Sequence, residues 1–87
     1  MPGATRAYQD SAGSSVLGGA NTVRVNGLPA AIRGKPIAGH GDHAHAGPVI
    51  VQSSNRVRAN GIGMVYQGCS TTCGHITTGS SNVFIGA

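Results

Sequence analysis

The residues best able to do chemistry are concentrated in two short stretches of this chain. The first, GHGDHAH at residues 39–45, holds His40, His43 and His45, and the second, CGH at residues 73–75, holds Cys73 and His75. Imidazole nitrogen and thiolate sulfur are the ligand types that tetrahedral zinc favours. We therefore expect these stretches to converge on one metal ion that holds the fold together.

The composition indicates why such a metal is needed. The 87 residues are enough for one domain with a modest core, and domains of this size often depend on a metal or a disulfide. Aromatic residues make up 3% and charged residues 9%, whereas charged residues usually approach a quarter of a soluble domain. Such a composition fits either a disordered Gly-rich chain or a compact β-rich piece that hides surface in an assembly. Short alternating runs of Val and Ile favour the assembly.

The charge pattern argues against a nucleic-acid partner. The formal net charge is +4, but Arg24, Arg33, Arg56 and Arg58 stand singly instead of clustering on one element. Aromatic residues that could stack on bases are nearly absent. We interpret the arginines as the solvated faces of strands. No apolar run is long enough for a membrane span or a secretory signal, so export would require a dedicated machine.

A repeated pattern predicts the fold. The segment NTVRVNGLPAAIRG at residues 21–34 aligns without gaps on NRVRANGIGMVYQG at residues 55–68, and a truncated third copy, NVFIG, occupies residues 82–86. Each full copy places Asn-Gly after an alternating run, which is the strongest short signal for a β-hairpin. We expect strands at residues 22–25 and 28–32, and an extended lead-in over residues 1–15. No helical period is present.

Three strand–turn–strand units can be arranged around a pseudo-threefold axis. The two ligand-rich stretches lie in the connections between copies, so the repeats would bring both to the same end of the molecule. The sequence therefore predicts one all-β domain over residues 1–87, with repeats at about 11–34, 35–68 and 69–87 and a metal site at one end.

Three motifs give the chain a family resemblance. They are VNGLPAA at residues 25–31, GHGDHAHAGPVI at residues 39–50 and CGHITTGSSNVFIG at residues 73–86. With these motifs the chain resembles the PAAR-repeat proteins, small metal-capped cones at the spike tips of type VI secretion systems and contractile phage tails. The name-giving Pro-Ala-Ala-Arg appears as residues 29–33 with Ile32 inserted before Arg33. The second copy departs further and has Gly-Met-Val at residues 63–65.

The resemblance implies a specific ligand set. It assigns one structural zinc ion near the vertex of the cone, with iron as the less favoured metal, to His40, His45, Cys73 and His75. His43 matches a variable position, and we interpret it as a surface residue. Asp42 is placed to orient an imidazole. Cys69 is either a buried small apolar residue, which we favour, or an alternative thiolate ligand.

The resemblance also implies a mechanical function. The chain would cap and sharpen a trimeric β-helical spike, of the VgrG-like or phage central-spike kind, as a monomer on a trimer, with apolar side chains buried at its base. It would contact the target membrane transiently, either at the tip of a virion tail or after passage through a type VI apparatus. The alternative is a small zinc-dependent hydrolase or a free zinc-binding module. With only two Asp and no Glu, the chain offers few groups for acid–base catalysis, and we expect no enzyme.

Overall fold

Two β-hairpins form at the two Asn-Gly pairs. The computed structural model describes residues 2–39, 41 and 46–85. Its antiparallel pairs are β1 (Ala20–Val25) with β2 (Leu28–Ala30), and β3 (Arg58–Ala59) with β4 (Ile62–Gly63). Asn26 and Gly27 have φ angles of 54° and 80°, and Asn60 and Gly61 have 54° and 78°. Positive φ at both central residues is what a type I′ turn requires, so both hairpin predictions are confirmed.

The remaining extended segments are joined by isolated bridges instead of long sheets. These bridges include Ile32 with Met64, Val16 with Ile37 and Ile50 with Thr71. No helix occurs in the described ranges, which confirms the predicted all-β class. It also means that no described segment is a helix able to cross a bilayer.

A closed ring of backbone hydrogen bonds lies at the centre of the molecule. The Thr5 N–H donates to the Val65 carbonyl (3.0 Å), the Val65 N–H to the Ala31 carbonyl (2.9 Å), and the Ala31 N–H to the Thr5 carbonyl (3.0 Å). All three residues are fully buried. The ring ties the N-terminal segment to the segments that follow each hairpin, so residues far apart in sequence fix one another.

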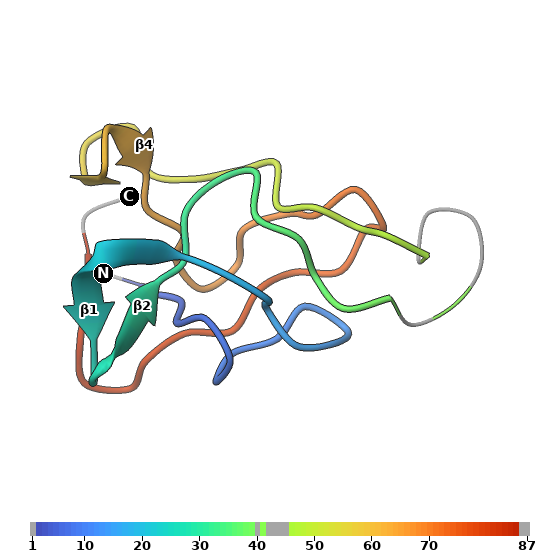
Figure 1. Ribbon diagram of the computed structural model, residues 1–87, viewed down its shortest axis with the longest axis horizontal. Coiled ribbons are helices and arrows are strands. Elements are labelled where there is room, and N and C mark those ends of the chain that lie inside the picture. Colours follow the sequence, from blue (N-terminus) through green and yellow to red (C-terminus); the bar gives the residue numbers. More distant parts are fainter. Residues whose placement is uncertain (1, 40, 42–45, 86–87) are drawn as a thin grey trace.

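The N-terminal segment is extended, as expected, but it is not a lead-in. The Ala4 N–H donates to the Val83 carbonyl (2.8 Å), and the Ile85 N–H donates to the Pro2 carbonyl (3.0 Å). The two ends of the chain therefore pair like the strands of a hairpin, on the same side of the molecule as β1 and β2 (Figure 1). Residues 3–5 are buried in the core, which the sequence did not predict.

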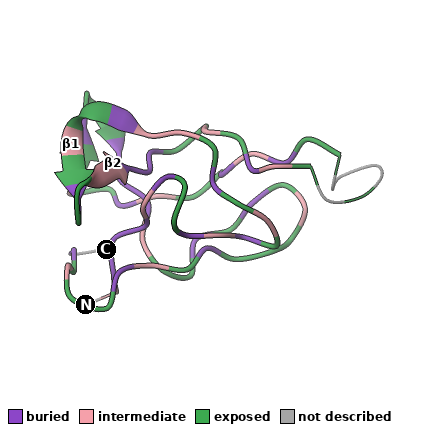
Figure 2. Ribbon diagram, turned by 60° about the horizontal axis from the view of Figure 1, so that its bottom comes forward, coloured by how far each residue is buried: buried purple, intermediate pink, exposed green. Residues whose placement is uncertain are grey.

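Small side chains fill two core clusters. The first lies among the hairpins and consists of Ala4, Ala20, Val25, Ala30, Ile32, Ala59, Met64 and Ile85. The second consists of Ala12, Val16, Ala31, Ile37, Ile50, Val65 and Cys69. Buried and exposed residues alternate along the chain segments around these clusters (Figure 2). Backbone hydrogen bonds join neighbouring segments directly, so the segments lie close together. Small side chains therefore fill the interior, and no large aromatic side chain is needed.

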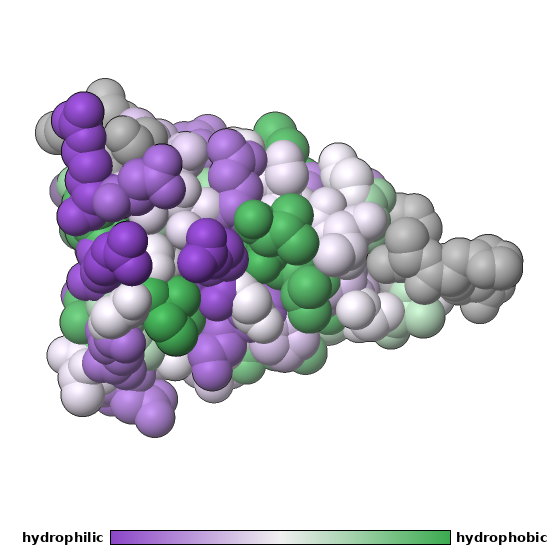
Figure 3. Space-filling view, turned by 90° about the horizontal axis from the view of Figure 1, so that it is seen from above, coloured by the Kyte–Doolittle hydropathy of each residue, from purple (hydrophilic) through white to green (hydrophobic). Residues whose placement is uncertain are grey.

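The molecule is wide at the hairpins and narrower at the opposite end (Figure 3). Its principal extents are 32 × 24 × 22 Å. The turns at residues 12–15 and 71–75 lie away from the hairpins, as do the segments that lead to residue 39 and from residue 46 (Figure 1). We call these two regions the hairpin end and the loop end.

Candidate metal centre

The described part of the candidate centre is the tight turn at residues 71–75. The Thr71 N–H and hydroxyl both donate to the His75 carbonyl, at 3.1 and 3.0 Å, and the Gly74 N–H donates to the Thr71 carbonyl at 3.1 Å. Gly74 adopts a φ of 89°, which glycine tolerates without a steric penalty. These bonds fix the backbone on which both Cys73 and His75 are carried.

The Cys73 thiol is placed to act as a thiolate. Its Sγ lies 3.2 Å from the Thr71 hydroxyl oxygen. Desolvation acts to raise the pKa of Cys73, but hydrogen bonding to the Thr71 hydroxyl and to the backbone amides of His75 and Cys73 outweighs it. The net pKa of Cys73 is below its ordinary value. Because the thiolate is the form that binds metal, this environment fits a ligand role.

The His75 imidazole rests on a glycine of another turn. Gly13, with a φ of 83°, has no side chain, and a Cβ built on it would lie 2.5, 2.8 and 2.9 Å from three atoms of the His75 ring. The N-terminal turn and the turn at residues 71–75 are therefore in contact through this ring. His75 remains exposed on its other side.

The segments that flank the histidine-rich stretch reach the same end. The Thr72 N–H donates to the Val49 carbonyl (3.0 Å), and the Ala38 N–H donates to the Ser15 carbonyl (2.9 Å). The segments before residue 39 and after residue 47 thus lie against the turns at residues 71–75 and 12–15. This placement is what a site shared between the two ligand-rich stretches requires.

The structure describes two of the four predicted ligands. Cys73 and His75 are described, whereas His40, His45, His43 and Asp42 lie outside the described residues. Within ranges 2–39, 41 and 46–85 no three His, Cys, Asp or Glu residues lie together. The four-ligand set therefore stays a prediction. The described pair, one thiol with a depressed pKa and one imidazole on a rigid turn, fits half of a tetrahedral zinc site.

Cys69 has a different environment. Its side chain is completely buried in the second core cluster, and burial raises the pKa of its thiol. Neither cysteine forms a disulfide. These features fit the favoured interpretation of Cys69 as a small apolar core residue.

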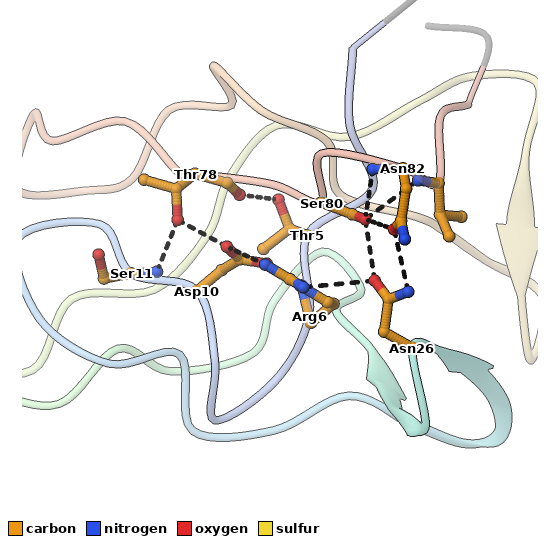
Figure 4. A network of polar contacts seen from close by, with 9 residues as sticks. Thr5, Arg6, Asp10, Ser11, Asn26, Thr78, Ser80 and Asn82 are labelled. Carbon is orange, nitrogen blue, oxygen red and sulfur yellow. Dashed lines mark hydrogen bonds and ion pairs between the residues drawn. The ribbon is translucent and has the colours of Figure 1, made fainter.

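A polar network that the sequence did not predict joins the two chain ends to the first hairpin (Figure 4). Arg6 Nε donates to Asp10 Oδ2 at 2.8 Å, and the Thr78 hydroxyl donates to Asp10 Oδ1 at 2.8 Å. Arg6 Nη1 reaches Asn26 Oδ1 (3.3 Å), and the Ser80 hydroxyl donates to the same Asn26 oxygen (2.8 Å). Asp10 is a buried carboxylate whose charge is matched by Arg6, so the network is structural.

Desolvation acts to raise the pKa of Asp10, but hydrogen bonds from Arg6 and Thr78 outweigh it and hold the pKa below its ordinary value. The same contact raises the pKa of Arg6. Within the described ranges Asp10 is the one acidic residue, and its side chain is buried.

The hairpin end presents a second surface of interest. Arg24, Arg56 and Arg58 are exposed there, together with asparagines at the turns, and hydrophilic side chains gather on the visible face of this end (Figure 3). Phe84 is 50% exposed and Ile62 is 38% exposed. The exposed surface of the strands is therefore basic and polar, with two apolar side chains.

No protein-family model matches the chain, and comparison with curated proteins finds no match.

Proposed function

We propose that the chain is a PAAR-type spike tip: a non-enzymatic, zinc-clipped cone that caps a trimeric β-helical spike and sharpens it for piercing a membrane. In this proposal the hairpin end is the base that docks on the spike, and the loop end is the vertex that meets the target membrane. The protein acts as a monomer on a trimer, in a contractile phage tail or a type VI apparatus.

The observation that carries the proposal is the cyclic order of hydrogen bonds. The ring of Thr5, Ala31 and Val65 is continued outward by bridges of Ala4 with Tyr66, Arg6 with Ala30, and Ile32 with Met64. Each bridge joins the residue before one ring member to the residue after another. We infer a pseudo-threefold axis through the ring, because the same pairing recurs three times in one rotational sense.

A second cycle lies farther from the hairpins. The Leu17 N–H donates to the Pro36 carbonyl (3.0 Å), the Val51 N–H to the Ser70 carbonyl (3.1 Å), and the Thr78 N–H to the Ser11 carbonyl (2.9 Å). Each bond crosses from one copy to the next. A chain built in this way has three similar faces, which suits a partner with true threefold symmetry.

The third copy is completed by the N-terminus. The pairing of residues 83–85 with residues 2–4 stands where the other copies have a closed hairpin. Ser54 Oγ accepts the N–H groups of Arg56 and Val57, and Ser80 Oγ accepts those of Asn82 and Val83. We infer that Ser80 corresponds to Ser54, so the third copy begins one residue earlier than the repeated asparagines indicate.

The metal in this proposal is structural zinc, held by His40, His45, Cys73 and His75. Its support is the ligand chemistry of the described half, since thiolate and imidazole are the donors of closed zinc sites. A closed set of four protein ligands leaves no position for a substrate. Zinc in this proposal cross-links the two ligand-rich stretches.

The base in this proposal is more polar than the sequence led us to expect. Arg24, Arg56 and Arg58 extend from the hairpin strands, and Asp10 is buried away from them. Phe84 and Ile62 supply the apolar contacts. The partner surface should therefore combine a small apolar patch with carboxylates, because an unpaired arginine buried at an interface is costly.

Titration with the recombinant C-terminal β-helix of a trimeric spike from the same source tests the docking. We expect a complex of one chain per trimer. Phe84→Glu should abolish binding or weaken it by at least tenfold, because it replaces a half-exposed apolar side chain of the proposed base with a charge. His43→Glu, in the stretch that this proposal assigns to the vertex, is the matched control and should bind like the wild type.

Two results would contradict the proposal. One is a folded, zinc-loaded protein that does not bind the spike. The other is loss of binding in the His43 variant alone, which would reverse the orientation. Zinc-dependent hydrolysis of ester or peptide substrates by the wild type, absent from the Cys73→Ser variant, would instead favour an enzyme.

A further inference from the structure

Thr71 is a polar residue at a buried position that is otherwise apolar. At the loop end, three residues send an N–H across the base of a turn: Ala12 to the Ser14 carbonyl, Ile37 to the Pro48 carbonyl, and Thr71 to the His75 carbonyl. All three are buried, and Thr71 is 5% exposed. A buried hydroxyl is tolerated only when it is hydrogen-bonded, so its partners indicate why it is there.

Those partners are the two residues that carry the described ligands. The Thr71 hydroxyl donates to the His75 carbonyl at 3.0 Å and lies 3.2 Å from Cys73 Sγ. The single hydroxyl proton serves one of these acceptors at a time. It goes to the His75 carbonyl when the Cys73 S–H donates to the Thr71 oxygen, and it can turn to the sulfur when Cys73 is a thiolate, because the Thr71 N–H still holds the His75 carbonyl. Valine at this position would fill the same space and provide neither contact.

Gly13 fixes the other ligand from the opposite side. The His75 ring lies so close to it that a Cβ would approach three ring atoms to 2.5–2.9 Å. The positive φ of Gly13, 83°, allows the turn to pass under the ring. Ring position is thus set by the backbone of a turn that contributes no ligand itself.

We propose that Thr71 and Gly13 are positioning residues of the metal centre: Thr71 holds the Cys73 thiolate and the His75 backbone, and Gly13 is the surface against which the His75 imidazole is seated. The inference rests on the proposed function, in which Cys73 and His75 are zinc ligands. Ligands held in place before the metal arrives lose less conformational freedom on binding, and residues that orient ligands typically contribute about 10–100-fold to affinity.

Thr71 is tested by zinc competition against a chromophoric chelator, using the full chain. We expect Thr71→Val to weaken zinc binding by about 10–100-fold. Thr71→Ser retains the hydroxyl and should restore the affinity to within a few-fold of the wild type. Thr77→Val is the matched control, because Thr77 is equally buried but its hydroxyl donates to the Tyr66 carbonyl (2.7 Å), away from both ligands.

Cobalt(II) spectra add a readout that stability alone does not change. In the wild type and Thr71→Ser we expect the thiolate-to-cobalt charge-transfer band of a tetrahedral site. In cobalt-saturated Thr71→Val this band should shift or weaken, because the sulfur has lost its oriented partner. Identical spectra and affinities for the wild type and Thr71→Val would overturn the role of Thr71, as would an equal loss in Thr77→Val.

Gly13 is tested by a double-mutant cycle. Gly13→Ala should weaken zinc binding at least tenfold when His75 is present and have no further effect in a His75→Ala background. Gly34→Ala is the matched control for backbone strain, because Gly34 has a φ of 92° and nothing within 4 Å of an added Cβ. Equal effects of Gly13→Ala in both backgrounds would overturn the role of Gly13.

The zinc stoichiometry of the wild type distinguishes failure of this inference from failure of the proposed function. One zinc per chain, with Thr71→Val and Gly13→Ala binding as tightly as the wild type, would overturn this inference and leave the proposed function intact. A folded wild type that binds no zinc would overturn both.

Discussion

The hairpin end and the loop end are held together by different means. At the hairpin end, Asn-Gly turns close two strand pairs, the chain termini form a third, and an apolar cluster packs between them. At the loop end, turns of different length are joined by a few backbone hydrogen bonds and by contacts such as that of His75 with Gly13. The first region is specified by local sequence and packing. The second region borders the second core cluster and carries the candidate ligands Cys73 and His75 on a turn.

This difference indicates how a chain with so few large apolar residues forms a pointed end. A narrowing shape limits the size of the hydrophobic interior, since small volumes bury little surface. A metal ion supplies many strong contacts in little space, and its binding free energy becomes folding free energy. If the proposed zinc is bound, its removal should lower the stability of the whole domain and should affect the loop end more strongly than the hairpin end.

Metal removal is expected to have the largest effect. Zinc at about a thousand times its dissociation constant contributes about 4 kcal/mol, and each kcal/mol corresponds to about 4–8 °C in a domain of this size. We therefore expect verified chelation to lower Tm by about 15–30 °C. Scanning calorimetry of matched holo and apo samples measures it.

Hydrogen exchange on the same samples distinguishes the two ends. Amides of Thr71 and Thr72 should lose protection in the apo protein, and ring amides of Ala31 and Val65 should keep most of theirs. An unchanged melt, or loss of protection that is uniform along the chain, would show that the metal does not act on the loop end.

Substitution of Asp10 is expected to have an intermediate effect on both ends, because its network runs from the first hairpin to Thr78. Asp10→Asn keeps the size and removes the charge that Arg6 matches. Hydrogen bonds to a charged group contribute about 1.5–3 kcal/mol, so we expect a loss of that order in urea unfolding at pH 7. Thr78→Val, which removes one bond to the same carboxylate, should cost less.

The pH dependence of the Asp10 effect has a definite sign. The folded-state pKa of Asp10 is lowered, so its contribution is present above the unfolded pKa, about 3.9, and is lost as the pH falls through the folded value. The difference in stability between the wild type and Asp10→Asn should therefore shrink below about pH 4. A difference that stays constant from pH 7 to pH 2 would mean that the carboxylate charge contributes nothing.

Tyr8 allows the smallest test, at a point between the two ends. Tyr8 has a φ of 68°, and its N–H donates to the Val16 carbonyl. Two glycines with positive φ make the matching bonds: the Gly34 N–H donates to the Ile50 carbonyl, and the Gly68 N–H donates to the Thr77 carbonyl. A non-glycine residue in the left-handed region is strained by roughly 1–2 kcal/mol, partly offset by the greater freedom of unfolded glycine. Tyr8→Gly should raise Tm by about 2–8 °C, from a net gain of roughly 0.5–1 kcal/mol.

Gly34→Ala is the reciprocal variant and should lower the stability. A decrease in Tm for Tyr8→Gly would show that the exposed Tyr8 side chain makes contacts that outweigh the backbone strain.

The sequence predicted the features that depend on neighbouring residues. Asn26-Gly27 and Asn60-Gly61 each favour one turn type, so both hairpins could be placed to within a few residues. The lack of a helical period in the apolar residues is also a local feature, and it predicted the all-β class. Of the two interpretations left open for Cys69, the favoured one, a small apolar core residue, agrees with its complete burial.

Features that depend on distant residues were not predicted. Residues 3–5 carry no alternating pattern of large apolar side chains, and their partners, such as Val65 for Thr5 and Phe84 for Gly3, are distant in the sequence. The Gly13–His75 contact and the Thr71–Cys73 contact depend on loop geometry.

The most direct test of the account is X-ray absorption at the zinc edge, combined with metal content, on the purified protein. The account predicts one zinc per chain in tetrahedral coordination, with one sulfur at about 2.3 Å and three nitrogens at about 2.0–2.1 Å. Cys73→Ser should remove the sulfur shell and Cys69→Ser should leave it unchanged. A spectrum without sulfur, a coordination position filled by water, or a folded protein free of metal would contradict the proposal that zinc closes the loop end.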